Sequence, residues 1–468
     1  MGSLTGTLSL AAQALEADQG ALQVTSNNIA NANTPGYSRQ VAVFESAPTV
    51  TEGDLTFGQG VTLAQVQGIR DNVVELGVQQ GLAQQGQVNS YLSSMNQVQS
   101  LFNETQGAGL QTPLSNFFEA FQNLSTDPTN TSLRQAVISA GQTLASAFNQ
   151  AASGLSQVQS GLNTAIPQAV GQINQLTGQI AQLNGEVQSA QNSGANPSQL
   201  IDQRNNLIEQ LSGLVGVNNI TQSDGTVTLT TSNGALLVAG QQSYNLVTGT
   251  GPSGNTDVFS QQGTDITTNL TGGSLGGYIQ ARDGSNGVVA AEQSLDQLAY
   301  SVGNAVNSQQ EAGYDGNGNL ATNEPFFNLP ANGSTGTASM ISVALTDPSQ
   351  IAASSAPPPA TGDNGNALAL ANIENQPLPG LGGQSAINYY SNFVANVGTE
   401  VAQATNEQTA QDLVVQQLQN QKASISGVSL DEESANLIQY QTAYSASARV
   451  VNVINQIAQT ALTLGQGS

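Results

Sequence analysis

The sequence contains no cysteine, no histidine and no tryptophan. Without cysteine, the chain can form neither disulfide bonds nor thiolate metal sites. Without histidine, it lacks the commonest general base and the commonest metal ligand of proteins. These absences argue against an enzyme, and we expect no catalytic residues, no metal site and no cofactor.

Charge is scarce and mostly of one sign. Only 8% of the residues are charged, and 7 Lys and Arg stand against 31 Asp and Glu, which gives a net charge of −24. Nucleic acids and anionic membranes repel such a chain, so neither is an expected partner. No run is long and apolar enough to span a membrane. The start of the chain also lacks the basic region and apolar block of a cleaved secretory signal.

Three short motifs resemble sites of known chemistry, and each is interpreted as a turn or loop. Residues 272–276 fit the G-x-S-x-G nucleophile elbow, but no histidine can activate Ser274, so we expect a glycine-rich turn between strands. Residues 249–254 fit G-x-G-x-x-G, yet a strand rather than a phosphate-binding helix is predicted to follow. Residues 315–319 resemble the start of a calcium loop, but Leu320 and Phe326 replace the Gly and Glu of an EF-hand.

Both ends of the chain are predicted to be helices with one narrow apolar seam. In the first helix the apolar residues recur at every seventh position: Leu8, Leu15, Leu22 and Ile29. The last helix has two such series, Leu437, Tyr444, Val451 and Ala458, and Tyr440, Ser447, Ile454 and Ala461. A narrow seam packs against another helix rather than into a broad core, and neither helix would be stable alone in water. We therefore expect the two terminal helices to pair.

A polar segment, NNIANANTPGYSRQ at residues 27–40, ends the first helix. Its Pro-Gly pair at residues 35–36 favours a turn, because proline presets φ and glycine supplies a positive φ. The asparagine side chains, including Asn27, Asn28 and Asn31, both donate and accept hydrogen bonds. They therefore suit contacts between several chains, although asparagine also favours helix ends for local reasons. Arg39 carries the only positive charge of the first 69 residues.

The last helix has a start signal of its own. Ser429 and Glu432 have the spacing of a capping box, and three acids at residues 431–433 would lie at the positive end of the helix dipole. Adjacent carboxylates at a helix start are more often dipole and capping residues than a catalytic cluster, so this acidic run is assigned to the helix start.

The rest of the chain predicts helices interrupted by β structure. Helical periodicity covers residues 71–103, 114–124, 132–190, 200–211, 287–311 and 387–422, with Pro167 expected to kink the third of these helices or to mark a join. Short strands are expected between residues 227 and 247, and residues 41–68 favour an extended connector or short hairpin. The predicted fold is mainly α with a β-containing middle, and its long terminal helices pair N to C.

This order predicts a nested domain organisation. Residues 1–36 and 428–468 are assigned to a terminal coiled-coil domain. Residues 37–214, 287–311 and 367–427 are assigned to a helical domain. Residues 215–286 and 312–366 are assigned to small, β-rich outer regions.

Two segments resemble the bacterial flagellar axial proteins: NNIANANTPGYSRQ, and GVSLDEESANLIQYQTAYSASARVV at residues 427–451. Residues 37–40 and 430–433 have the forms of the hook-associated protein 1 group, which joins hook to filament. The likeness extends over residues 204–217, 272–284, 295–318 and 351–370. Many relatives are longer and carry a larger outer β domain, which this chain lacks.

The resemblance implies a structural subunit that forms a ring or helical layer of identical copies between hook and filament. It further implies the hook protein and a second junction protein as neighbours, and a cytoplasmic chaperone that binds the C-terminal helix. Export would be unfolded, through the flagellar secretion apparatus, to the extracellular flagellum. The expected assembly interface comprises Leu8, Leu15, Leu22, Asn27, Asn28, Ile29, Asn31, Tyr37, Arg39, Leu437, Tyr440, Tyr444, Val451 and Ile454.

Two other functions fit parts of the sequence. The first is another axial subunit, such as the hook, the distal rod or the second junction protein, against which the form of residues 37–40 argues. The second is a secreted enzyme or an adhesin with a coiled-coil stalk. An adhesin would not need matched seams at both extreme termini.

Overall fold

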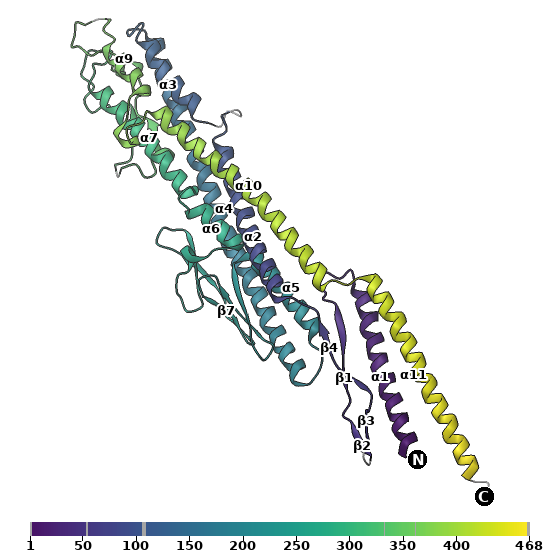
Figure 1. Cartoon of the computed structure of the whole chain (residues 1–468). Helices are drawn as coiled ribbons and strands as arrows, with labels where there is room; N and C mark the ends of the chain where they lie inside the picture. The colour runs from purple at the N-terminus through teal and green to yellow at the C-terminus, as the bar shows by residue number, and fades with distance from the viewer. Residues whose placement is uncertain (1, 53–54, 105–108, 332, 361, 466–468) are drawn as a thin grey trace.

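The structure, a computed structural model, describes residues 2–52, 55–104, 109–331, 333–360 and 362–465. The molecule is elongated, and both chain ends lie at the same end of it (Figure 1). The terminal helices α1 (Gly2–Asn31) and α11 (Leu430–Gly465) form this end, and they contact each other. The pairing predicted from the two seams is therefore confirmed, as is the mainly α fold class.

A bundle of long helices forms the body. Its members are α2 (Asn72–Leu101), α3 (Gln111–Leu124), α4 (Thr131–Asn192), α5 (Ser198–Leu214), α6 (Gly273–Asp283), α7 (Val288–Glu311) and α10 (Ala386–Ser426). The helix α2 packs along α10, and α3 packs on α4. An aromatic cluster lies in the core of this bundle. In it, Phe117 packs against Phe118, Phe121, Phe326 and Phe327 at ring-centroid distances of 5.3 or 5.4 Å.

Short elements and loops cover the end of the body that is farthest from the chain termini (Figure 1). They are β11 (Phe327–Asn328), α8 (Thr337–Met340), β12 (Ser342–Val343), η3 (Pro348–Gln350), α9 (Gly365–Asn372), η4 (Ile373–Asn375) and η5 (Pro379–Leu381). The loop that resembles a calcium site lies here. Asp315 Oδ1 accepts hydrogen bonds from the backbone N–H groups of Asn317 and Asn319, so this carboxylate folds the loop on itself.

A long antiparallel hairpin lies beside α1. Strands β1 (Gln40–Ser46) and β4 (Val61–Gly68) pair from Gln40 opposite Gly68 to Ser46 opposite Val61, with a register shift after Val43. Strands β2 (Val50–Glu52) and β3 (Leu55–Phe57) extend its tip. Residues 41–68 were expected to form an extended connector or a short hairpin. They form a hairpin, and it is longer than expected.

A second group of strands forms a bulge on the side of the body (Figure 1). Its four-stranded sheet has the order β5 (Val217–Thr221), β6 (Val227–Thr231), β7 (Leu236–Ala239) and β8 (Gln242–Ser243). Strands β9 (Val247–Thr250) and β10 (Thr256–Phe259) form a hairpin, which η2 (Thr267–Asn269) follows. Leu229 and Val238 of this sheet are buried in a core with Ile173 and Ile208 of α4 and α5.

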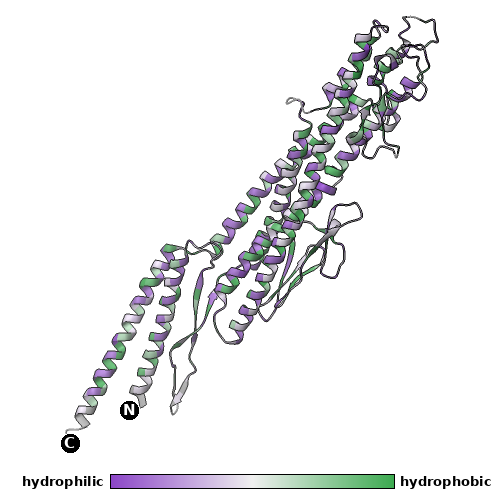
Figure 2. Cartoon of the chain, turned by 180° about the vertical axis from the view of Figure 1, so that it is seen from behind, coloured by the Kyte–Doolittle hydropathy of each residue, from purple (hydrophilic) through white to green (hydrophobic). Residues whose placement is uncertain are grey.

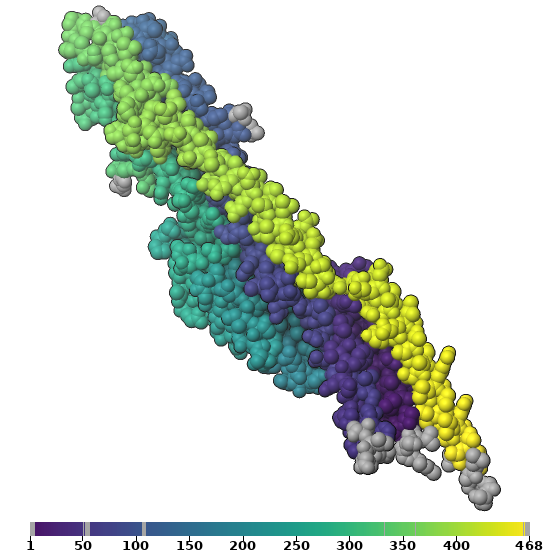
Figure 3. Space-filling view, viewed as in Figure 1, coloured from purple at the N-terminus to yellow at the C-terminus, as the bar shows by residue number. Residues whose placement is uncertain are grey.

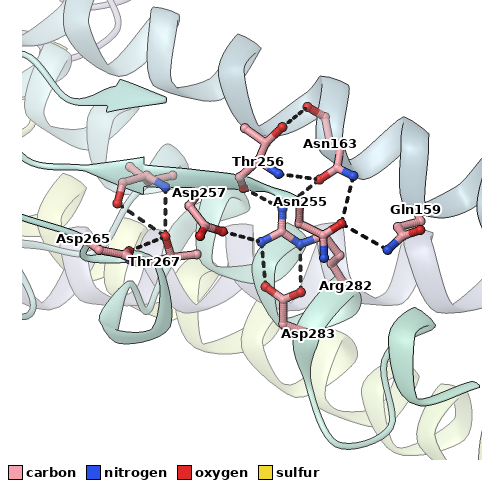
Figure 4. Close-up of polar contacts among 10 residues, drawn as sticks. Gln159, Asn163, Asn255, Thr256, Asp257, Asp265, Thr267, Arg282 and Asp283 are labelled. Carbon is pink, nitrogen blue, oxygen red and sulfur yellow. Dashed lines mark hydrogen bonds and ion pairs between the residues drawn. The ribbon is translucent and has the colours of Figure 1, made fainter. Parts of the chain in front are cut away.

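Pro167 was expected to kink this helix or to mark a join, and the join is wrong, because α4 continues through the proline. Proline has no N–H, so the carbonyl four residues earlier, that of Asn163, loses its helical donor. The hydroxyl of Thr256 in β10 donates to this carbonyl at 3.2 Å. The side-chain oxygen of Asn163 also accepts from the Thr256 N–H at 3.0 Å. The proline thus creates the point at which β10 attaches to α4 (Figure 4).

A buried arginine completes this attachment. Arg282 of α6 is fully buried, and its guanidinium donates to Asp283 through two nitrogens, at 2.9 and 2.6 Å. A third nitrogen donates to the Thr256 carbonyl at 2.6 Å and to Asn163 at 2.8 Å (Figure 4). Asp257 lies 3.5 Å from the guanidinium, and its pKa is raised, mainly by burial. A buried charge requires such partners, so Arg282 ties α4, α6 and β10 together.

One expected turn is wrong. Residues 272–276 were predicted to form a glycine-rich turn between strands, but α6 begins at Gly273. Glycine here serves close packing at the start of a helix. A Cβ at Gly273, where φ is 66°, would lie 2.1 Å from the backbone of Leu214, and one at Gly277 would lie 2.1 Å from Ser90 Oγ. The motif therefore lets α6 approach α2 and α5.

Arg282→Met should destabilise the protein by about 3–5 kcal/mol, because it leaves the buried carboxylate of Asp257 without its counter-charge. Urea unfolding monitored by circular dichroism measures this loss. As a control, Glu186→Gln alters an exposed residue of α4 whose side chain accepts from Gln182. It should change stability by less than about 0.5 kcal/mol. Wild-type stability of Arg282→Met would contradict the assigned role.

Candidate assembly site at the junction of the terminal helices

The two terminal helices pack closely because the side chains at the centre of α1 are small. Its buried residues include Ala11, Ala17, Ala21 and Thr25. The helix contacts α11 on one side and the β1–β4 hairpin on another. On the hairpin side, a Cβ at Gly20 would lie 2.6 Å from Leu63 of β4. Small residues therefore let α1 lie between two partners.

The residues of the predicted seams are only partly covered within the chain. Most are only half-buried: Leu8, Leu15, Leu22, Ile29, Leu437, Tyr440 and Val451. Ile454 is the exception at 6% exposure, while Tyr444 is exposed. The large apolar side chains therefore keep surface that a further partner could cover.

Asn28 connects the end of α1 to the start of α11. It is 1% exposed, and its side-chain N–H donates to Glu433 Oε2 at 3.0 Å and to the Gln40 carbonyl at 2.8 Å. Its oxygen accepts from the Gln40 N–H at 2.9 Å and from the Tyr37 hydroxyl at 2.8 Å. Both donors and both lone pairs of the amide are thus used within the chain.

Glu433 receives the second half of this connection from Arg39. The carboxylate is 2% exposed, and Arg39 Nε donates to its Oε1 at 2.8 Å. Arg39 also reaches Glu432 Oε2 at 2.8 Å, and its backbone N–H donates to the Ser426 carbonyl at 2.8 Å. Asn28, Tyr37, Arg39 and Glu433 are called the junction cluster below.

The junction cluster corrects the capping-box prediction in one respect. Ser429 Oγ does accept from the Glu432 N–H, at 3.5 Å, the long limit of a hydrogen bond. The Glu432 carboxylate, however, pairs with Arg39. The acids at residues 432–433 therefore bind a cation from the other end of the chain, beyond any interaction with the helix dipole.

A second carboxylate fixes the same segment to the body. Asp202 of α5 accepts from the Ser38 N–H at 3.0 Å through one oxygen. Its other oxygen accepts from Arg70 at 3.0 and 2.6 Å, and Arg70 also donates to the Ser198 carbonyl at 2.7 Å. Sequence reasoning missed Arg70 and Asp202. Their only signal is the rarity of cations in this chain, which makes each one a candidate for a specific carboxylate.

The Tyr37 hydroxyl remains a proton donor at physiological pH. Burial, followed by the charges of Asp202 and Glu433, raises the pKa of Tyr37 to about 12. The hydroxyl donates to Asn28 Oδ1, as above, and lies 3.2 Å from Asn27 Oδ1. The phenol therefore stays neutral beside two carboxylates.

Asn27 and Asn31 make local contacts. Asn31 donates to the carbonyl and the side-chain oxygen of Asn27 at 3.0 and 2.9 Å, and it accepts from Thr34 at 3.2 Å. The turn at residues 34–37 lines a groove of about 440 Å³ together with α4 and α5. Whether these residues contact neighbouring chains stays a prediction.

The described part of the chain holds no group of three or more Asp or Glu that could bind a metal ion. Among the same residues, no helix is long and apolar enough to cross a membrane. The junction cluster joins α1, α11 and α10 through polar contacts.

Known families match most of the chain in three parts. The model "Flagellar hook-associated protein FlgK helical domain" matches residues 95–327. "Flagella basal body rod protein" matches residues 8–37, and "Flagellar basal body rod FlgEFG protein C-terminal" matches residues 419–464. The last two cover Asn28 and Tyr37 at one end of the chain and Glu433 at the other.

Whole relatives are similar over nearly the full length. "Flagellar hook-associated protein 1" of Escherichia coli is 28% identical, with 97% of this chain and 98% of that protein covered. The protein of the same name from Bacillus subtilis is 29% identical, with 96% of each covered. The solved hook junction protein FlgK of Burkholderia pseudomallei shares the fold, with a TM-score of 0.66 at 20% identity, covering 75% of this chain and all of that one. The chain therefore belongs to the flagellar hook-associated protein 1 family of structural, non-enzymatic proteins of the bacterial flagellum.

Proposed function

We propose that this chain forms the layer that joins hook to filament, and that its copies polymerise through α1 and α11. The observation that carries this proposal is the exposed apolar face of α11. This helix leaves Ile438 65% exposed, and Val450, Val453 and Ile457 are exposed as well. Apolar residues recur along the outside of this helix (Figure 2). Several exposed apolar side chains along one helix mark an interaction site.

On this proposal the half-buried seam residues and the exposed face of α11 become buried between copies. The expected interface keeps the residues named from the sequence, with Asn28 acting from inside the chain and Asn27 and Asn31 from its surface. The hook protein and a second junction protein would contact the layer from either side. A chaperone that covers α11 before export would shield the same apolar face in the cytoplasm. The assembled layer would then be extracellular, after export of the unfolded chain.

The junction cluster would give the layer its stiffness. Polymerisation through the terminal helices places the body outside only if the two parts keep a fixed angle. Buried, fully paired polar groups favour one geometry, because each alternative leaves a charge or an amide without its partner. Glu433 therefore holds the terminal helices in register, and Asp202 holds the following segment against the body.

Deletion of the gene should leave hooks without filaments, because flagellin then has no layer at the end of the hook on which to polymerise. Electron microscopy of the cells, with assay of flagellin shed into the medium, measures the effect, and expression of the wild-type chain is the control. A deletion strain with normal filaments would contradict the proposed function.

Glu433→Gln should loosen the angle between the terminal helices and the body, because Arg39 loses its buried counter-charge. The absence of native cysteine permits spin labels at Gln23→Cys and Gln210→Cys, exposed positions on α1 and α5. We expect a broader distance distribution between these labels.

The matched control for that experiment is Glu432→Gln. Glu432 pairs with the same arginine but is 61% exposed, so its ion pair contributes at most about 1 kcal/mol. The control should keep the narrow distribution of the wild type. Equal effects of the two substitutions would mean that the burial of Glu433 is not what fixes the angle.

A further inference from the structure

One cation of the described chain has no partner. Every other Lys and Arg pairs with a carboxylate or donates to carbonyl or amide oxygens: Arg39, Arg70, Arg134, Arg204, Arg282 and Lys422. Arg449 of α11 is exposed, and no hydrogen bond or ion pair joins it to any described residue. In a chain with a net charge of −24, a free cation is the exception.

Arg449 lies in the middle of an exposed stripe of α11. The stripe advances in steps of four or three residues, the spacing of one helix face, and comprises Ile438, Thr442, Ala446, Arg449, Val453 and Ile457. In the space-filling view α11 forms one edge of the molecule, with α1 beside it (Figure 3). The stripe is therefore accessible to another molecule.

The helix α1 carries an exposed stripe of the same period, with a single acid in its middle. Its members are Ser9, Ala12, Glu16, Gln19, Gln23, Ser26 and Ala30. Among the described residues Glu16 has no hydrogen-bond or ion-pair partner, and the rest of the stripe is small or neutral. A helix with an apolar stripe can approach such a surface closely.

The two unpaired charges lie at the same level along the molecule. Ser447 Oγ of α11 lies 3.4 Å from Asp18 Oδ2 of α1. Because the helices are antiparallel, two residues further along α11 correspond to two residues back along α1, which places Arg449 level with Glu16. Both side chains are exposed and no ion pair joins them, so they face away from each other.

We propose that Arg449 of one copy pairs with Glu16 of the next copy, so that the α11 stripe packs on the neighbour's α1 stripe. This inference rests on the proposed polymerisation through the terminal helices and names its contact. The contact is head to tail, and such an interface closes into a ring or continues as a helix. Charge supports this occupant. Copies that each carry −24 repel one another, and Arg449 is the available cation where their terminal helices meet.

Charge reversal tests the pair in the full chain, expressed in the deletion strain. Arg449→Glu and Glu16→Arg should each lower the fraction of hooks that carry a filament by about tenfold or more, because like charges then face each other at every contact. Arg449→Gln should cost less than about threefold, as expected for a neutralised surface pair. Neither reversal should shift the melting temperature of the soluble protein, because neither residue has a partner within the described chain.

Rescue identifies the partner. The double variant Arg449→Glu/Glu16→Arg restores opposite charges at every contact, so filaments should return. Co-expression of the two single variants should also restore filaments. When copies of the two variants alternate, positions 449 and 16 carry opposite charges across each contact between chains, but like charges within each chain. Gln441→Glu, an exposed change about two turns away on α11, is the control and should behave as wild type.

Three outcomes would overturn the pair: wild-type filaments with both single reversals, no rescue by the double variant, or rescue by the double variant without rescue by co-expression. The last would place the pair within one chain. None of these touches the proposed function, which fails separately if the deletion strain itself keeps its filaments.

Discussion

The architecture depends on one buried carboxylate. Glu433 accepts from Arg39 and Asn28, two residues that flank the turn at the end of α1. A buried charge without these donors would be unstable, so the start of α11 can lie only where the end of α1 presents them. The contact between Asn28 and Glu433 joins residues 405 positions apart in the sequence. It closes the chain into an elongated molecule whose two ends act as one unit.

The body repeats the same principle. Arg282 holds the β10 hairpin to α4 and α6, and Arg70 with Asp202 holds the segment after α1 to α5. With so few charges, ion pairs act at the joints between elements, while Gln, Asn, Ser and Thr supply most of the polar side chains. Arg449 stands outside this pattern, which is why a contact between copies is the role left for it.

Local signals made much of the fold predictable. The seven-residue repeats depend only on neighbours along one helix, so they correctly gave the terminal helices and their pairing. The sequence also singled out Asn28, Tyr37 and Arg39. It assigned the acids at residues 432–433 to the helix start, because a local rule explains them and their true partner is far away in the sequence. Arg70 and Asp202 were missed for the same reason, at a separation of 132 residues.

Other errors have a packing cause. The glycines of residues 272–277 favour a turn when read alone, yet close approach to α2 and α5 uses them at the start of a helix. Pro167 was predicted to kink α4 or to mark a join; the helix instead continues through it, and a hydroxyl from β10 donates to the carbonyl that the proline leaves without its helical donor. In both cases tertiary contacts overrode a local preference. The predicted domain boundaries remain predictions.

The central claim is that the terminal helices are anchored at the junction cluster and completed by neighbouring copies. Hydrogen exchange of the soluble protein and of assembled flagella tests it most directly. The account predicts slow exchange at residues 24–30 and 433–440 in the soluble protein, and faster exchange at residues 8–15 and 450–461, which lie farther along the helices from the junction cluster. On assembly the second group should become protected. Strong protection of both groups in the soluble protein, or no gain on assembly, would contradict the account.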